Sequence, residues 1–134
     1  SADLTRKRRE LREEIQRIYA ASSELAEFCP DRELIIYKID TSHYILGVIA
    51  SNLVKDPPNK VVLILNQFGT EISGEIREGE NADKNLVQMM LKVKDKDFPY
   101  GSVGGHPRAA GCLFDAEHEK DFRRIFLEAF DESI

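Results

Sequence analysis

The sequence predicts an α/β fold: a single domain with a mixed β-sheet and helices packed on its faces, preceded by an N-terminal linker helix. Segments of helical period alternate along the chain with apolar, β-branched runs that are typical of strands. One such run, Val61 to Leu65, is continuously apolar, as in a central strand covered on both faces. A chain of 134 residues can build one domain with a real core, and a second full domain would not fit.

The N-terminal segment predicts a helix over residues 2–28, because Leu4, Leu11, Ile18 and Leu25 recur at intervals of seven. The segment also carries six bases and six acids, so its apolar stripe is narrow and needs a partner surface. We expect this helix to contribute little to the core of the domain. We interpret it as a linker to another domain, with a coiled-coil dimer arm as the alternative.

We therefore divide the chain into a linker helix, residues 1–29, and a domain, residues 30–134. Pro30 ends the helix because proline cannot continue it. The elements expected in the domain are, in order, strand 34–39, helix 44–54 capped by Thr41 or Ser42, strands 61–68 and 72–77, a helix opening at Asp83, strand 109–114 and helix 117–130. A start at Ser1 inside a helical pattern favours a chain cut from a longer protein.

The apolar positions predict which face of each element is buried. Those expected inward are Ile45, Val48, Ile49 and Leu53 on the first domain helix, Leu86, Val87, Met90 and Leu91 on the next, and Phe122, Ile125, Phe126, Ala129 and Phe130 on the last. Strand 72–77 alternates, with Ile72, Gly74 and Ile76 on one face and Ser73, Glu75 and Arg77 on the other. The second face is polar and is a candidate for function.

The segment 101–111, Gly-Ser-Val-Gly-Gly-His-Pro-Arg-Ala-Ala-Gly, predicts a loop that binds an anion. Glycine reaches positive φ at little cost, so successive backbone N–H groups can form a concave nest for a phosphate. Pro107 biases His106 toward an extended conformation, and Arg108 adds a permanent charge with a planar fork of donors. The alternative is a plain connection between strands.

Charge is unevenly distributed along the chain. The net charge of −5 argues against a protein that coats nucleic acid, which would usually be basic. From Lys84 to Arg108, however, five bases oppose two acids, whereas from Asp115 onward seven acids oppose three bases. A positive region around the glycine-rich segment suits a focused phosphate site.

The glycine-rich segment, following the strand that ends at Arg77, resembles the signature of the DHH-associated domain. This is the C-terminal substrate-binding domain of DHH-superfamily phosphoesterases, which include RecJ-type exonucleases, nano-RNases and cyclic-dinucleotide phosphodiesterases. The resemblance covers roughly residues 34–130, and Val103 departs from it where many members have a further glycine. It implies that Gly104, Gly105 and His106 contact substrate phosphate and sugar.

Arg77 aligns with the arginine that ends the corresponding strand in the resembled family, and it shares the polar strand face with Ser73. The alternative is a surface arginine paired with Glu75 or Glu78. The expected substrate-binding residues are therefore Gly104, Gly105, His106, Arg108, Arg77 and Ser73.

We expect no catalytic residue and no metal ligand in this chain. Hydrolysis of a phosphodiester with metal help needs a cluster of Asp and His ligands, and the family's Asp-His-His string is absent. His43 and His118 have no partners at ligand spacing, and Cys29 and Cys112 form no Cys-x-x-Cys, so we interpret both thiols as reduced and metal-free.

The expected function is that of a substrate-binding domain of a phosphoesterase, excised from a longer chain. The chain itself would be inactive, with no cofactor, and manganese would belong to a missing N-terminal DHH catalytic domain. Expected partners are single-stranded nucleic acid, a short oligonucleotide or a (cyclic) nucleotide, that catalytic domain and a second copy as a homodimer, in the cytoplasm and not at a membrane. The alternatives are a non-catalytic nucleic-acid-binding module, with tRNA as one ligand, and a dimerisation module.

Overall fold

A computed structural model describes residues 1–41, 45–55, 60–80, 82, 84–96, 101–106 and 109–132. The strands are β1 (Ala26–Cys29), β2 (Leu34–Ile39), β3 (Val61–Phe68), β4 (Glu71–Glu78), β5 (Gly101–His106) and β6 (Ala109–Asp115). The helices are α1 (Ala2–Leu25), α2 (Leu46–Leu53), α3 (Leu86–Asp95) and α4 (Glu119–Asp131), with single 3-10 turns at Pro30–Arg32 and Ala116–His118. Among these helices, none has the length and apolarity that crossing a membrane requires.

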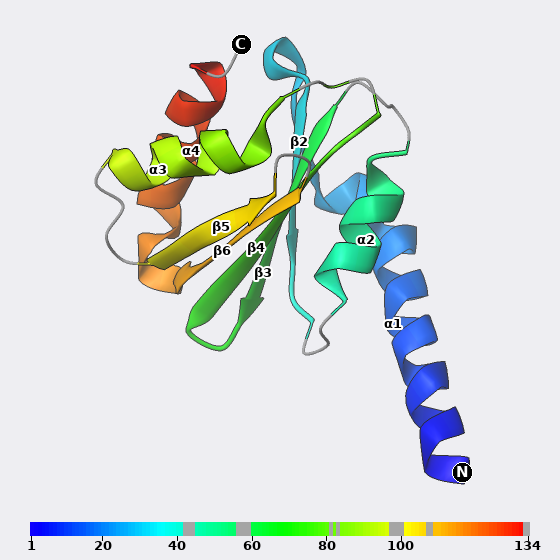
Figure 1. The fold of residues 1–134 in the computed structure, drawn as a ribbon. Helices are drawn as coiled ribbons and strands as arrows, with labels where there is room; N and C mark the ends of the chain where they lie inside the picture. The colour runs from blue at the N-terminus through cyan, green and yellow to red at the C-terminus, as the bar shows by residue number, and fades with distance from the viewer. Residues whose placement is uncertain are drawn as a thin grey trace.

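The described strands form one mixed sheet in the order β1-β2-β3-β4-β6-β5 (Figure 1). Strands β2 and β3 run parallel, and α2 lies in the crossover that parallel strands require. The pairs β1–β2, β3–β4, β4–β6 and β5–β6 are antiparallel. The mixed α/β sheet expected from the sequence is therefore confirmed.

Helices cover both faces of the sheet, and a separate core lies on each. The sheet face that α3 and α4 cover, here the α4 face, buries alternate residues of β2, β3, β4 and β6 against these helices. The opposite face, here the α2 face, buries Ile35, Tyr37, Ile39, Val62 and Ile64 against α1 and α2. Strand β3 contributes to both cores, as its continuous apolar run predicts.

Helix α4 carries an aromatic row into its core. Phe122, Phe126 and Phe130 are fully buried, and the Phe122 ring stacks on Phe114 of β6 with 4.5 Å between centroids. Lys84 lies over the other end of this row, with its Nζ 4.0 Å from the centroid of Phe130. The inward face predicted for the last helix is confirmed.

The N-terminal helix is shorter than predicted, because α1 ends at Leu25 and the next four residues form β1. The pairing of this segment with the edge of β2 explains the difference, and Pro30 adds to it by disfavouring the α region at Cys29. The segment assigned to a linker helix therefore contributes the outermost strand of the sheet.

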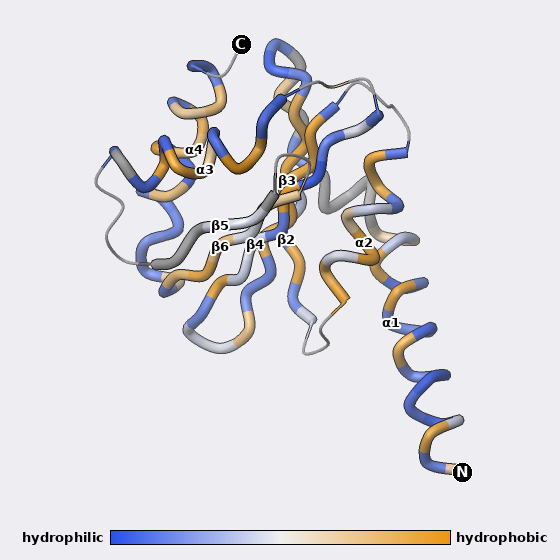
Figure 2. Tube along the Cα trace, viewed as in Figure 1, coloured by the Kyte–Doolittle hydropathy of each residue, from blue (hydrophilic) through white to orange (hydrophobic). Residues whose placement is uncertain are grey.

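Helix α1 is also anchored in the core, contrary to expectation. Ile18 is 2% exposed within the α2-face core, and Leu11 and Ile15 pack against that core. Residues 1–10 are exposed instead, and this half of α1 extends away from the sheet with a mostly hydrophilic surface (Figures 1 and 2). Two residues of the stripe proposed for dimerisation, Leu11 and Ile18, are thus packed against the domain itself, whereas Leu4 is exposed.

Two predicted inward positions and one helix start are wrong. Val48 of α2 and Leu91 of α3 are exposed, because each helix packs through a narrower face than its apolar content suggests. Helix α3 starts after Asn85, whose side-chain oxygen accepts the Gln88 backbone N–H at 3.1 Å. Asp83, the predicted start, and Ser42, a predicted cap, lie outside the described residues, and α2 begins without a side-chain cap bond.

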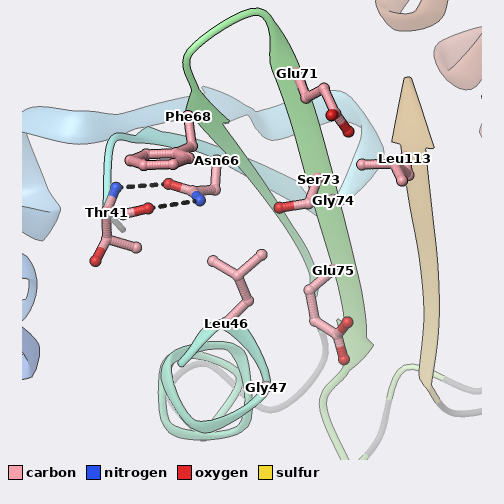
Figure 3. Close-up of a pocket in the computed structure, with 10 residues that line it drawn as sticks. All are labelled: Thr41, Leu46, Gly47, Asn66, Phe68, Glu71, Ser73, Gly74, Glu75 and Leu113. Atoms are coloured by element: carbon pink, nitrogen blue, oxygen red, sulfur yellow. Dashed lines mark hydrogen bonds between the residues drawn. The ribbon is translucent and has the colours of Figure 1, made fainter. Parts of the chain in front are cut away.

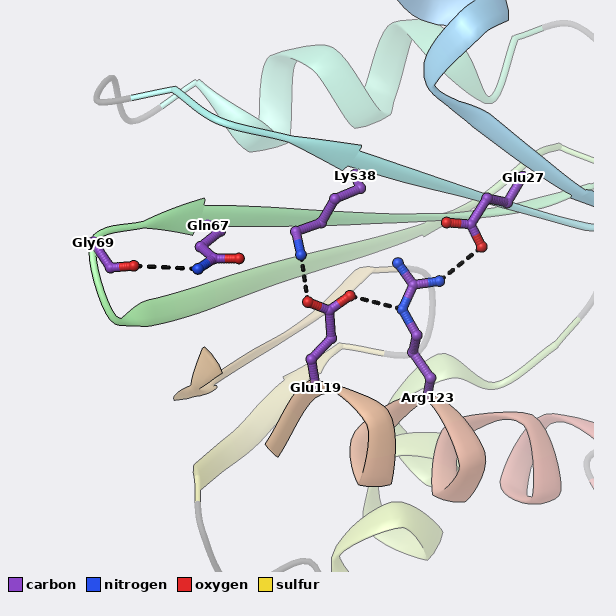
Figure 4. Close-up of polar contacts among 6 residues, drawn as sticks. All are labelled: Glu27, Lys38, Gln67, Gly69, Glu119 and Arg123. Carbon is purple, nitrogen blue, oxygen red and sulfur yellow. Dashed lines mark hydrogen bonds and ion pairs between the residues drawn. The ribbon is translucent and has the colours of Figure 1, made fainter. Parts of the chain in front are cut away.

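A chain of ion pairs fastens α4 to the sheet (Figure 4). Glu119 accepts hydrogen bonds from Lys38 of β2 and, at 2.9 Å, from Arg123 one turn along α4. Arg123 in turn donates to Glu27 of β1 at 2.8 Å. Burial acts to raise the pKa of Glu119, but the bonds from Lys38 and Arg123 outweigh it and hold that pKa below its ordinary value.

Replacing Glu119 by Gln should lower the free energy of unfolding by about 1 kcal/mol at pH 7. Because the folded pKa of Glu119 is depressed, its contribution is present above the unfolded pKa of about 4.3 and is lost as the pH falls through the folded pKa. Urea unfolding at pH 7 and pH 3 measures this, with Glu128→Gln, which removes an exposed pair on the same helix, as the control. Equal losses in the two variants, or a difference that persists at pH 3, would contradict it.

Replacing Ile18 by Ala should lower the free energy of unfolding by about 2 to 4 kcal/mol, because it leaves a cavity in the α2-face core. Leu4 is 48% exposed in the same heptad stripe, so Leu4→Ala should cost less than about 0.5 kcal/mol. Chemical denaturation of both variants makes the comparison. If the two variants are equally stable, α1 is a linker and not part of the core.

Candidate functional site

The glycine-rich segment is a β-hairpin and not the predicted loop. Gly104 pairs with Gly111, Gly105 with Ala110 and His106 with Ala109. In an extended strand successive N–H groups point to opposite edges, so they cannot converge on one point. Along residues 101–106 and 109–111, which the structure describes, the expected nest of consecutive backbone donors is therefore not formed. An anion site on these two strands would rely on side chains.

The glycines of this hairpin serve two different purposes. Gly105 has φ +138°, and a Cβ atom there would lie 2.5 Å from both the carbonyl oxygen of Ala109 and the Cα of Ala110, so only glycine fits. A Cβ atom at Gly104 would meet nothing within 4 Å. Gly104 is thus not demanded by packing, and its effect is to leave the sheet surface bare.

The register gathers small residues on the α2 face beside the polar residues of β4. Glu75 of β4 pairs with Gly111 of β6, which pairs with Gly104 of β5. In the neighbouring row, Arg77 pairs with Ala109, which pairs with His106. We call Gly104, Ala109 and Gly111 the small-residue strip.

Two of the predicted site residues cannot be placed completely. Arg108 and the side chain of His106 lie outside the described residues, so their roles stay predictions. What the structure adds is that the backbone of His106 lies in the same row as Arg77, with Ala109 of the strip between them.

The Arg77 side chain lies against α2, and its Nε donor has no partner among the described residues. Its Nη2 lies 2.8 Å from Glu75 Oε1, and a Cβ atom at Gly47 of α2 would lie 3.3 Å from the same nitrogen. Of the two ion-pair partners considered for Arg77, Glu75 is therefore the one observed. Glu78 lies on the α4 side and accepts the Lys84 N–H at 2.7 Å. The Nε of Arg77 is buried and, among the described residues, has no hydrogen-bond partner.

A pocket of about 540 Å³ opens on the same face, between the start of α2 and the strands β3, β4 and β6 (Figure 3). Its lining residues are Thr41, Leu46, Gly47, Asn66, Phe68, Glu71, Ser73, Gly74, Glu75 and Leu113. Ser73 was expected at the site, whereas Asn66, Phe68 and Glu75 were not. A polar residue directly after the buried run Val61–Leu65 was the signal that could have indicated Asn66.

Asn66 fixes one wall of this pocket. Its side-chain oxygen accepts the Thr41 N–H at 2.7 Å, and its amide nitrogen donates to the Thr41 carbonyl at 3.0 Å. Both groups are buried, so the pair ties the segment that leads into α2 to the end of β3. The pocket wall is therefore preorganised.

The titratable groups around the site differ in what they can do. Burial raises the pKa of Glu75, and the charge of Arg77 acts against that rise. Burial also raises the pKa of Cys112 to about 12, and raises that of Cys29. Both cysteines are free, and with raised pKa values neither is an activated nucleophile.

His118 has neighbours that its sequence spacing did not suggest. The ligand atoms of Asp115, Glu117 and His118 lie within 4.8 Å of one another. Asp115 ends β6, and Glu117 and His118 lie in the 3-10 turn that follows it. Both carboxylates are exposed, and exposed acidic groups are common without an ion. We assign no metal to this cluster.

Neither a protein-family model nor a curated protein sequence matches this chain. Solved structures do match. RecJ from Thermus thermophilus, in complex with Mn²⁺, has a TM-score of 0.63 and 21% identity over 96% of this chain and 18% of its own. The pGpG-specific phosphodiesterase PggH from Vibrio cholerae has a TM-score of 0.60 and 13% identity over 96% of this chain and 43% of its own. The C-Ala domain of alanyl-tRNA synthetase from Aquifex aeolicus has a TM-score of 0.60 and 16% identity over 78% of this chain and 96% of its own.

The chain spans less than half the length of the RecJ and PggH chains and matches nearly the whole C-Ala domain. At identities of 13 to 21%, the TM-scores of 0.60 to 0.63 establish the fold alone. They bear out the resemblance read from the glycine-rich segment, although that segment is a hairpin. The chain therefore has the fold of a DHH-associated domain of the RecJ type.

Proposed function

We propose that this chain binds phosphate-bearing nucleotides or nucleic-acid ends, as the C-terminal substrate-binding domain of a longer DHH-type phosphoesterase. The parent protein would be a manganese-dependent exonuclease or a phosphodiesterase acting on oligonucleotides or cyclic dinucleotides. Support for the domain type comes from the shared fold, in which RecJ and PggH each carry this domain as a minor part of a longer chain.

The observation that carries the proposal is Arg77 beside the small-residue strip. Its Nε is buried without a partner among the described residues, whereas the Arg77 side chain as a whole is 29% exposed, so part of the guanidinium is within reach of a ligand. The strip leaves the sheet bare next to this guanidinium, so an anionic oxygen can approach closely. A phosphate is the ligand that best uses the planar fork of an arginine.

Hydrolysis belongs to another part of the parent protein in this proposal. A two-metal phosphodiesterase needs several Asp and His ligands around ions a few ångströms apart. In the described part of the chain, the one grouping of that chemistry is the exposed turn with Asp115, Glu117 and His118. The purified chain should accordingly bind its ligand without turning it over.

A second candidate is a nucleic-acid-binding module without phosphoesterase chemistry. The C-Ala domain favours it, because 96% of this single domain of a tRNA synthetase matches 78% of the present chain. The sequence of the complete gene separates the two candidates. An Asp-His-His string with companion aspartates upstream supports the phosphoesterase, and a different upstream domain supports the module.

Replacing Arg77 by Lys should weaken binding of a short 5′-phosphorylated oligonucleotide about tenfold or more, because lysine keeps the charge but lacks the planar fork. Arg124→Lys, on the exposed side of α4, is the matched control and should change nothing. Calorimetric titration measures the affinity of each variant. The same oligonucleotide without its 5′-phosphate should bind the two variants equally weakly. Unchanged affinity in Arg77→Lys would rule out this arginine as the phosphate ligand.

Replacing His106 by Ala should weaken binding of the same oligonucleotide about ten- to a hundredfold and leave the melting temperature nearly unchanged. His118→Ala, at the turn after β6, should affect neither quantity. Titration beside a thermal melt of each variant tests this. A lowered melting temperature with unchanged affinity would mean that His106 supports the hairpin and does not touch the ligand.

A further inference from the structure

Apolar side chains stand open to solvent around the pocket of Figure 3. Phe68, at the end of β3, is 66% exposed, and Leu113 of β6 is 43% exposed. Figure 3 shows the Phe68 ring on one side of the pocket and Leu46 on another, with Ser73 and Glu75 along β4. An aromatic ring kept at the rim of a pocket, with a wall fixed by Asn66, suits a flat apolar ligand surface.

The pocket is acidic, whereas Arg77 beside it carries a positive charge that is paired with Glu75. Two carboxylates, Glu71 and Glu75, line it, and no lysine or arginine is among its described lining residues. A phosphate inside it would be repelled, whereas a neutral group that offers N–H donors would be attracted. The two parts of the α2 face thus select different parts of one ligand.

Glu75 joins these two parts. Its Oε1 pairs with Arg77, and its Oε2 lies over the strip, 3.6 Å from where a Cβ atom of Gly111 would be. Among the described residues no hydrogen bond is made to Oε2, so this oxygen is free to accept from a ligand. Glu75 and Arg77 lie on the same strand face two residues apart, about 7 Å along the backbone.

We infer that this pocket binds the nucleobase next to the phosphate held at Arg77, with Phe68 stacking on the ring and Glu75 accepting from an exocyclic amino group. The inference rests on the proposed phosphate site and adds base selectivity to it. Adenine, guanine and cytosine carry such an amino group. Uracil and thymine have no exocyclic amino group, and their N3–H donor is flanked by two carbonyl oxygens, which Glu71 and Glu75 disfavour, so the site should discriminate against them.

The experiment titrates the full chain with 5′-phosphorylated diadenylate, 5′-phosphorylated diuridylate and ribose 5-phosphate. The unaltered chain should bind the diadenylate more tightly than the diuridylate. Phe68→Ala should weaken diadenylate binding about tenfold, as base stacking on an aromatic side chain predicts, and leave ribose 5-phosphate binding unchanged. Leu91→Ala, an exposed apolar residue on α3, is the matched control and should bind all three ligands as the unaltered chain does.

Glu75→Gln should reduce the preference for diadenylate over diuridylate, and a thermal melt checks that this variant folds. If Phe68→Ala binds diadenylate as well as the unaltered chain does, the base pocket is overturned while the phosphate site stands. If the unaltered chain binds neither diadenylate nor ribose 5-phosphate, the proposed function fails, and this inference fails with it. Equal affinity of the unaltered chain for the two dinucleotides would overturn the selectivity assigned to Glu75.

Discussion

The strict alternation of β4 is the constraint on which the rest of the structure depends. Ile72 and Ile76 point into the aromatic core under α4, so Ser73, Glu75 and Arg77 must point to the α2 face. Strand β4 pairs with β3 on one side and β6 on the other, which fixes its register twice. A slip by one residue would bury Glu75 and Arg77 among the phenylalanines, and the free-energy cost of burying these charges would unfold the domain. The position of the candidate site is therefore a consequence of core packing.

The elements that pack on the α2 face cover only part of it. Helix α2 packs over β3 and reaches as far as Arg77, which lies against Gly47. Beyond that point the strip of Gly104, Ala109 and Gly111 carries no side chain larger than a methyl group. Asn66 bonds to both backbone groups of Thr41 and so fastens the chain that follows β2 to the end of β3 beside the pocket. A ligand that bound there would lose little free energy in ordering this part of the wall.

A glycine-rich segment can present an anion site in two ways, and our proposal assigns the less obvious one to this chain. Glycines in a loop turn backbone N–H groups toward a ligand, whereas glycines in a strand remove the side chains that would keep a ligand away. Gly105 is required for the close approach of β5 to β6, and Gly104 is not. In the proposed site, specificity consequently passes from backbone donors to side chains on neighbouring strands, with Arg77 and Glu75 placed beside the bare surface.

The sequence by itself determined what depends on local pattern: the strands β2, β3, β4 and β6, the aromatic face of α4, and the polar row that holds Ser73 and Arg77. Periodicity reports which side of an element is apolar, and that side was right wherever the element is packed along its whole length. Only the tertiary structure decided what depends on contacts between distant residues. Strand β1 exists because β2 has an edge to pair with, and the pocket exists because Asn66 bonds to Thr41, 25 residues earlier. Phe68 and Glu75 also line this pocket, which the sequence did not predict. The pattern within a strand does not indicate which loop or helix packs opposite it.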